Sequence, residues 1–152
     1  MTKVYDQTDI KQASLIRRIA ALTYDLLIVI AILFVVSGIG LLINHNEMIP
    51  EPLYRSLHQS VLFLSVFLFY GYFWTRSGQT IGMMAWHIRV QTLEGYSLSW
   101  KHALIRFFTA GASIACLGLG YLWMLFSDQH LTWHDQISNT RVVRLAPKKK
   151  NT

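Results

Sequence analysis

The sequence predicts an all-α membrane protein. We expect a helical bundle with two clear transmembrane helices, a third apolar helical segment and a small interfacial hairpin. Of its 152 residues, 53% are hydrophobic and 14% are charged, whereas a soluble domain carries about 25% charged residues. The apolar residues gather into three long blocks instead of recurring at amphipathic spacing. We expect one membrane domain over 1–152, with its core at about 14–143 and polar tails at 1–13 and 144–152.

The first two blocks predict membrane spans. Residues 26–43 form a run of 18 without a formal charge, which with flanking residues covers the roughly 30 Å hydrocarbon core. This run is longer than a signal-peptide core, so we expect it to remain in the mature chain. The second block covers about 57–74 and ends in FYGYFW. Aromatic side chains of this kind are typical of a membrane interface.

The third block, 107–126, leaves two topologies open. It is long enough to cross, but it contains Gly111, Gly118 and Gly120. Four Lys and Arg precede the first block, one lies at 44–59, four lie at 75–106 and five follow residue 127. The positive-inside rule therefore favours a cytoplasmic tail as well as a cytoplasmic N-terminus. Three full crossings would put the tail outside, so we favour a block that is broken and returns near 117–120.

The segment between the second and third blocks predicts an interfacial hairpin. Alternation around 87–92 indicates a short strand, and Glu94-Gly95 indicates a turn. Ser99 can then cap the helix that leads into the third block, because its hydroxyl can accept from a free backbone N–H. Trp86 and Trp100 suit the headgroup level on either side.

Asp25 is the most informative residue, because it lies within the first membrane helix. A charged side chain at a helix centre costs roughly 2.5–3.5 kcal/mol, so the carboxylate should be paired, hydrated or protonated. Arg18 lies two turns earlier on the same face, about 10 Å away along the axis, which allows contact only through water. Arg106, at the entry of the third block, is the better partner for a direct ion pair. We interpret Asp25 as a functional residue and Arg17 as a headgroup anchor.

The Trp133-His134-Asp135 motif is the second acidic feature. Asp135 follows the last apolar block, so the sequence gives no argument for its burial. His130 and His134 are four residues apart and, with Asp128 or Asp135, imitate a metal site. No third strong ligand has a compelling spacing, and Cys116 is the only cysteine. We expect no metal and no disulfide.

The sequence also lacks the common catalytic motifs. It has no G-x-S-x-G, no H-E-x-x-H and no P-loop lysine. We therefore expect no enzyme and no cofactor.

An ordered series of motifs resembles the RDD family of small membrane proteins. The series comprises Arg18-x6-Asp25, the G-x-T-x-G of 78–82, HIRVQTLEGYSLSW with Arg106 behind it, and LGLGYLW leading into TWHDQISNTRVV. The resemblance covers about 14–143, and it implies that Arg18, Asp25 and Asp135 are the arginine and two aspartates that name the family. With Arg106 they form our candidate binding set. The chain departs from the family pattern at Met83, Met84 and Ser138-Asn139.

The resemblance implies transport, and more narrowly monovalent cation/proton exchange, since some family members resemble such antiporters. A membrane carboxylate such as Asp25 can bind a proton or a cation. The alternative is a non-transporting scaffold, or a lipid-binding or partner-binding module, in which the Arg/Asp cluster is structural.

The size and charge pattern lead to expectations about assembly and location. Two or three crossings can hardly enclose a pathway, so we expect a homodimer or higher homo-oligomer. We place the chain in the inner (plasma) membrane, multi-pass, with both termini cytoplasmic. Its expected partners are the lipid bilayer and monovalent cations or protons, not nucleic acid.

Overall fold

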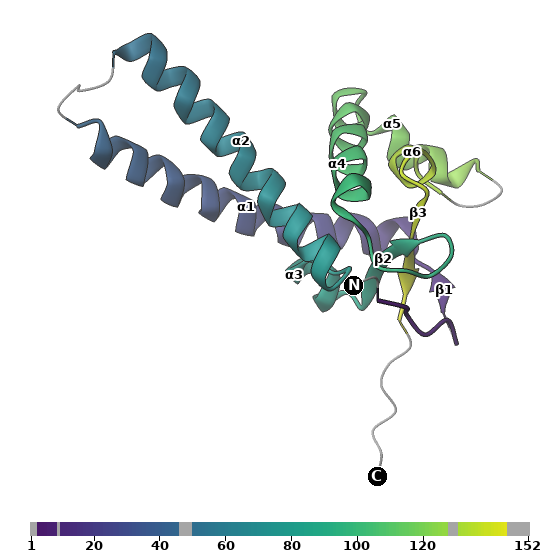
Figure 1. Ribbon diagram of the computed structural model, residues 1–152. Coiled ribbons are helices and arrows are strands. Elements are labelled where there is room, and N and C mark those ends of the chain that lie inside the picture. The colour runs from purple at the N-terminus through teal and green to yellow at the C-terminus, as the bar shows by residue number, and fades with distance from the viewer. Residues whose placement is uncertain (1–2, 9, 46–49, 128–130, 146–152) are drawn as a thin grey trace.

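Two long helices form a hairpin that extends from the rest of the molecule (Figure 1). The computed structural model describes residues 3–8, 10–45, 50–127 and 131–145. Helix α1 runs over Leu15–Ile43 and α2 over Glu51–Arg76. Both are long and apolar enough to cross a membrane, which confirms two helices of membrane-spanning length at the first two predicted spans. Helix α1 begins well before its uncharged run, so its first turns carry Arg18 and Asp25 on one buried face.

The third block is helical but sharply bent. Helix α4 (Trp100–Ala115) is followed by α5 (Leu119–Leu122) and the 3-10 turn η1 (Trp123–Leu125), and the pair is bent by 106°. At the break, Leu117 and Gly118 have φ angles of 55° and 78°. These left-handed conformations end α4, and the amide of Gly118 donates to the carbonyl of Ser113 at 2.9 Å. The predicted break in this block is therefore confirmed.

A small antiparallel sheet joins three distant parts of the chain. Its strands are β1 (Lys11–Gln12), β2 (Ile88–Thr92) and β3 (Thr140–Arg144), in the order β1-β3-β2. Val90 lies opposite Val142. Because Lys11 pairs with Arg144, part of the segment predicted as a polar N-terminal tail is an edge strand of this sheet.

The predicted hairpin is corrected by this pairing. The strand and the turn are present, and the amide of Thr92 bonds to the carbonyl of Tyr96 at 2.9 Å. The strand's main partner is β3, however, not the residues after the turn. Ile88 and Val90 are fully buried against this partner, whereas the chain after Gly95 turns away toward Ser99 to start α4.

Two short helices flank this sheet. Helix α3 (Ile81–Ala85) packs against α1, and α6 (Trp133–Ile137) packs against α4. Ser99 caps α4 as predicted, in a capping box with His102. The hydrophobic core lies at the junction of α1, α2, α4 and the sheet. It is formed by Ala13, Ala21, Trp74, Ile88, Val90, Leu98, Ala103 and Val142.

Candidate functional site

Three charged side chains form a buried cluster where α1, α4 and α6 meet. One carboxylate oxygen of Asp135 accepts from Nη1 of Arg18, and the other accepts from Nη1 of Arg106. Asp135 is 0% exposed, and both arginines are also buried. We call Arg18, Asp135 and Arg106 the charged triad. It ties the first turns of α1 to a residue that follows the last apolar block.

Backbone and hydroxyl groups complete the triad. Arg18 donates from Nε to the carbonyl of Ala13 at 3.3 Å, and Arg106 donates to the hydroxyl of Thr140 at 2.7 Å. Asp135 lies in the first turn of α6 and accepts from the amide of Thr132 at 3.5 Å. The triad therefore holds the start of α1, the start of α6 and the start of β3 against α4.

The electrostatics of the triad follow from its burial and from its two positive charges against one negative charge. Burial alone would raise the pKa of Asp135, but the guanidiniums of Arg106 and Arg18 outweigh burial and hold this pKa well below its usual range. Burial, then Arg106, lowers the pKa of His134 to about 3. His134 is therefore neutral at pH 7. Two guanidiniums share one carboxylate, so the triad carries one net positive charge.

Asp25 lies apart from this triad. It is 3% exposed, and it accepts hydrogen bonds from the hydroxyl of Thr80 and from the amide of Gly82, the latter at 2.8 Å. A Cβ at Gly82 would collide with the backbone carbonyl of Ala21 and lie 3.0 Å from Cγ of Asp25. The G-x-T-x-G motif thus supplies the hydroxyl, the amide and the close approach of α3 to α1.

The structure corrects one prediction about these charges and adds one feature that was not predicted. Arg106 pairs with Asp135 instead of Asp25, and Asp135 is fully buried although it follows the last apolar block. In both cases the sheet is the reason, because pairing of β3 with β1 and β2 draws the preceding α6 against α4. Sequence reasoning also missed Thr80 and Thr140 as partners. The G-x-T-x-G motif was the one signal available for Thr80.

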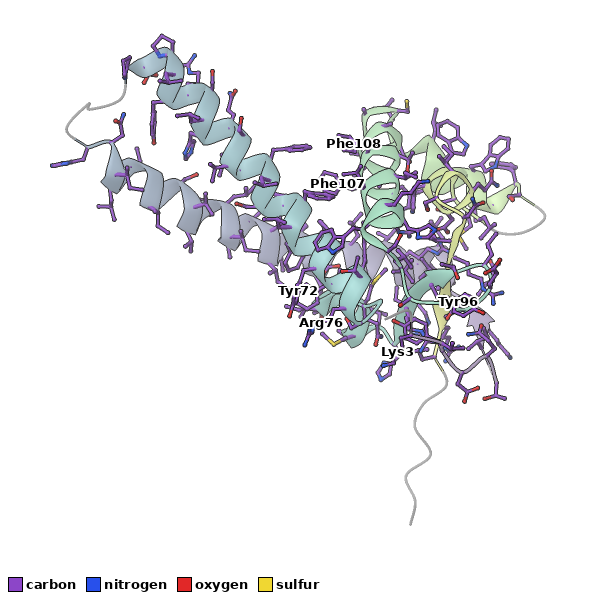
Figure 2. All side chains as sticks on the ribbon, in the orientation of Figure 1. Lys3, Tyr72, Arg76, Tyr96, Phe107 and Phe108 are labelled. Carbon is purple, nitrogen blue, oxygen red and sulfur yellow. The ribbon has the colours of Figure 1, made fainter. Side chains whose placement is uncertain are left out.

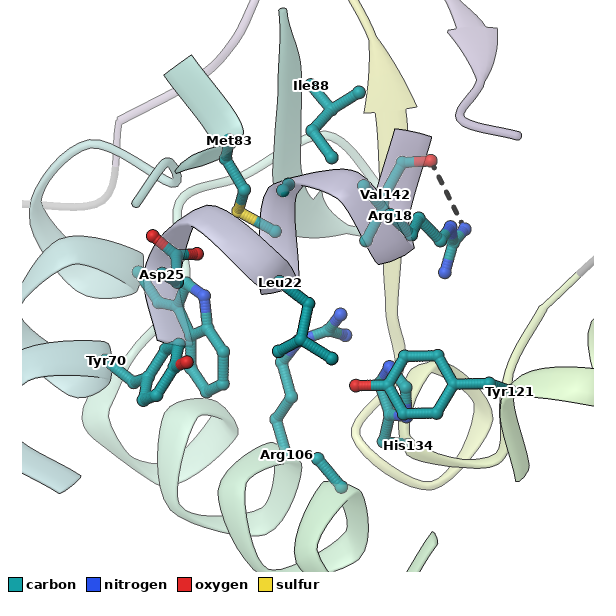
Figure 3. A pocket seen from close by; sticks show the side chains of 13 residues that line it. Arg18, Leu22, Asp25, Tyr70, Met83, Ile88, Arg106, Tyr121, His134 and Val142 are labelled. Carbon is teal, nitrogen blue, oxygen red and sulfur yellow. Dashed lines mark hydrogen bonds between the residues drawn. The ribbon is translucent and has the colours of Figure 1, made fainter. Parts of the chain in front are cut away.

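A chamber of about 50 Å³ separates Asp25 from the triad (Figure 3). Arg18, Arg106 and Asp25 all line it, whereas Asp135 lies behind the guanidiniums. Three buried polar atoms on lining residues have no hydrogen-bond partner within the described structure: Nε1 of Trp74, Nε of Arg106 and Nδ1 of His134. Tyr70 and Tyr121 add hydroxyl-bearing rings to the wall. The candidate site is therefore a small polar space between a carboxylate and two guanidiniums.

Metal binding finds no support in the part of the chain that is described. Over those residues, no three His, Cys, Asp or Glu side chains lie close enough to hold a metal ion. His130 and Asp128, which the sequence suggested as ligands, lie outside the described residues. His134 instead approaches the hydroxyl of Thr132 with Nε2 at 3.0 Å and packs on the Tyr121 ring at 4.7 Å.

The apolar helices and the buried charges define a small α-helical membrane protein. The family model of the RDD family matches residues 12–139, and the chain belongs to this family. Neither a curated protein nor a solved structure matches the chain.

Proposed function

We propose that this protein exchanges monovalent cations for protons and that Asp25 carries the exchanged ion. One observation supports this most directly. Asp25 is a buried carboxyl group in a membrane-spanning helix, it lines a chamber, and among the described residues it has no ion-pair partner. A carboxylate in that setting can be neutralised by a proton or by a cation.

The two aspartates differ in what they can still bind. Asp135 has a guanidinium on each oxygen, so binding a proton or cation would require breaking an ion pair. A carboxylate offers about four acceptor sites, and Asp25 has one hydroxyl and one amide as hydrogen-bond donors. We therefore assign exchange to Asp25 and a structural role to the charged triad.

The small sheet supports a membrane topology for this function. Strand β1 precedes α1 and pairs with β3, which follows the bent third block. Paired strands must lie on one side of a hydrocarbon core about 30 Å thick. We propose that α1 and α2 cross the inner membrane, that the bent segment α4 to η1 is re-entrant, and that the sheet lies on the cytoplasmic side, where the positive-inside rule puts the basic segments.

A second candidate function has an observation of its own. The triad is almost completely buried and each carboxylate oxygen of Asp135 is paired with a guanidinium, as expected of charges that fix helix packing. In a scaffold or a lipid-binding module, Asp25 would serve only to hold α3 through Thr80 and Gly82.

The substitution Asp25→Asn separates the two candidates. An asparagine oxygen can still accept from the amide of Gly82, and the NH₂ group of the side chain can donate to the hydroxyl of Thr80. The neutral amide, however, cannot exchange a proton for a cation as a carboxylate can. Asp6→Asn is the matched control, because Asp6 is an exposed carboxylate outside the helices.

The assay uses proteoliposomes with a pH-sensitive dye inside and Na⁺, K⁺ or Li⁺ added outside. We expect exchange by the native chain and by Asp6→Asn, and none by Asp25→Asn with unchanged circular dichroism and gel-filtration profile. If well-folded native protein moves none of these ions, exchange is the wrong function. If Asp25→Asn unfolds, the carboxylate is structural.

We also propose that the exchanger is a homodimer or larger homo-oligomer. Two crossings and one bent segment can hardly enclose a pathway alone, so a second copy of the chain would have to complete it. Light scattering corrected for bound detergent measures the protein mass directly, and a monomer at all protein concentrations would refute this assembly.

A further inference from the structure

An apolar cleft of about 720 Å³ separates the α1–α2 hairpin from α4. Phe107 and Phe108 project from α4 on the side of the hairpin (Figure 2), and the Phe63 ring lies 5.6 Å from that of Phe107. Apolar side chains of α1 such as Leu26 and Val29 form the facing wall. The cleft is therefore lined by three membrane helices.

The cleft adjoins the polar chamber. Five residues line both spaces: Leu22, Tyr70, Trp74, Ala110 and Tyr121. The apolar cleft therefore ends at the space bounded by Asp25 and Arg106. A ligand that fills both spaces must have a long apolar part and a small polar end.

Two buried donors that line the chamber have no acceptor within hydrogen-bond distance in the described part of the chain. Trp74 is 7% exposed and Arg106 is 3% exposed, and both line the chamber. Nε1 of Trp74 and Nε of Arg106 have no partner within the described structure. Both groups can only donate, and leaving a buried donor unsatisfied is unfavourable. These donors select a ligand end that accepts hydrogen bonds. The net positive charge of the triad favours a negative end, and the carboxylate of Asp25 in the same chamber opposes it.

The volumes of the chamber and the cleft narrow the choice of ligand further. The chamber volume of about 50 Å³ provides room for roughly three to five water-sized groups. A carboxylate, with three heavy atoms, fits this space. A phosphodiester has five heavy atoms, which would take up all of this space, and its second substituent would need further room beside it. The cleft lies within the range of about 300–1,000 Å³ that is usual for small-molecule sites, and its long apolar walls suit one acyl chain.

We propose that this cleft and chamber bind a long-chain fatty acid. The acyl chain lies between α4 and the α1–α2 hairpin, and the carboxylate accepts from Nε of Arg106 and Nε1 of Trp74. This goes beyond ion exchange, because the bound carboxylate would share the chamber with Asp25 and limit access to it. The charge of Asp25 opposes binding of a negative ligand, so Asp25→Asn should bind the fatty acid more tightly.

Quenching of tryptophan fluorescence by 9,10-dibromostearic acid measures this binding on the full chain in detergent micelles. Trp74 lines both spaces, so its fluorescence should be quenched saturably, and Trp74→Phe should lose most of the quenching. The methyl ester of the same acid lacks the negative charge, and we expect it to bind at least tenfold more weakly. Dibrominated phosphatidylglycerol tests the competing phosphate headgroup.

Two glycines provide a matched pair of variants. A Cβ at Gly111 or at Gly38 would meet nothing within 4 Å, so leucine can be placed at either position without a clash at Cβ. Gly111 lines the cleft and Gly38 does not. Gly111→Leu should therefore weaken binding of dibromostearic acid at least tenfold, while Gly38→Leu should leave it unchanged.

Several results would overturn the proposal: equal binding of the acid and its methyl ester, tighter binding of the phospholipid than of the acid, or full binding by Gly111→Leu. None of these measurements depends on ion exchange. Failure of the fatty-acid site and failure of the exchange function can therefore be told apart.

Discussion

Replacing Asp135 by asparagine should destabilise the protein strongly. The carboxylate of Asp135 is fully buried and is paired with both Arg18 and Arg106. An asparagine side chain would keep nearly the same volume but would leave two buried guanidiniums without a counter-charge. Removing one partner of a buried ion pair costs about 3–5 kcal/mol, and here one substitution leaves two cations uncompensated. We therefore expect a loss of at least about 3 kcal/mol in the free energy of unfolding.

Unfolding of the purified chain by SDS in mixed micelles, followed by circular dichroism, measures this loss. Glu51→Gln is the control, because Glu51 forms an exposed ion pair with Arg55 at 3.7 Å, and such pairs contribute about 0–1 kcal/mol. If Asp135→Asn costs no more than Glu51→Gln, the triad does not stabilise the fold. A triple variant with Arg18→Met, Arg106→Met and Asp135→Leu should recover much of the loss, because apolar residues can replace a buried ion-pair group.

Two further predictions concern His134, which lies beside the triad, and Gly82, which lies beside Asp25. The pKa of His134 is lowered to about 3 in the folded chain, so between about pH 6.5 and 3 the unfolded chain binds a proton that the folded chain does not. The free energy of unfolding should then fall by about 2–3 kcal/mol as the pH is lowered from about 6.5 to 4.5. The variant His134→Gln should lack this fall. If its unfolding free energy shows the same pH dependence as that of the native chain, His134 is not the group responsible. Gly82→Ala should destabilise the chain by about 1–3 kcal/mol, because its Cβ collides with the carbonyl of Ala21. Gly38→Ala, which meets open space within a helix, should instead stabilise by up to about 1 kcal/mol, and equal effects of the two variants in the same SDS titration would refute the argument.

Local patterns in the sequence were sufficient for the two long helices, the start of α4 and the break after it. Runs of apolar residues indicated both long helices, Ser99 indicated the start of α4, and the glycines near 118 indicated the break. Each of these features depends on residues a few positions apart. The shared face of Arg18 and Asp25 follows from helix periodicity and was predicted for the same reason.

The pairing of the charges could not be read from such patterns. Arg18 and Asp135 are 117 positions apart, and nothing near either residue indicates which guanidinium meets which carboxylate. Asp135 follows the last apolar block, so its position in the sequence gives no argument for burial, yet it is buried because β3 joins the sheet. The partner of β2 was missed for the same reason, since the turn after Thr92 resembles that of a local hairpin.

The long sequence separation within the triad determines when during synthesis its ion pairs can form. Arg18 leaves the ribosome with the first helix, while its counter-charge is synthesised only near the end of the chain. Until α6 and β3 arrive, Arg18 and Arg106 have no carboxylate of Asp135 to pair with, and the middle strand of the sheet is missing. The helices can therefore form their final contacts only after Asp135 has been synthesised. A chain truncated before that residue would leave Arg18 and Arg106 without the carboxylate that pairs with them.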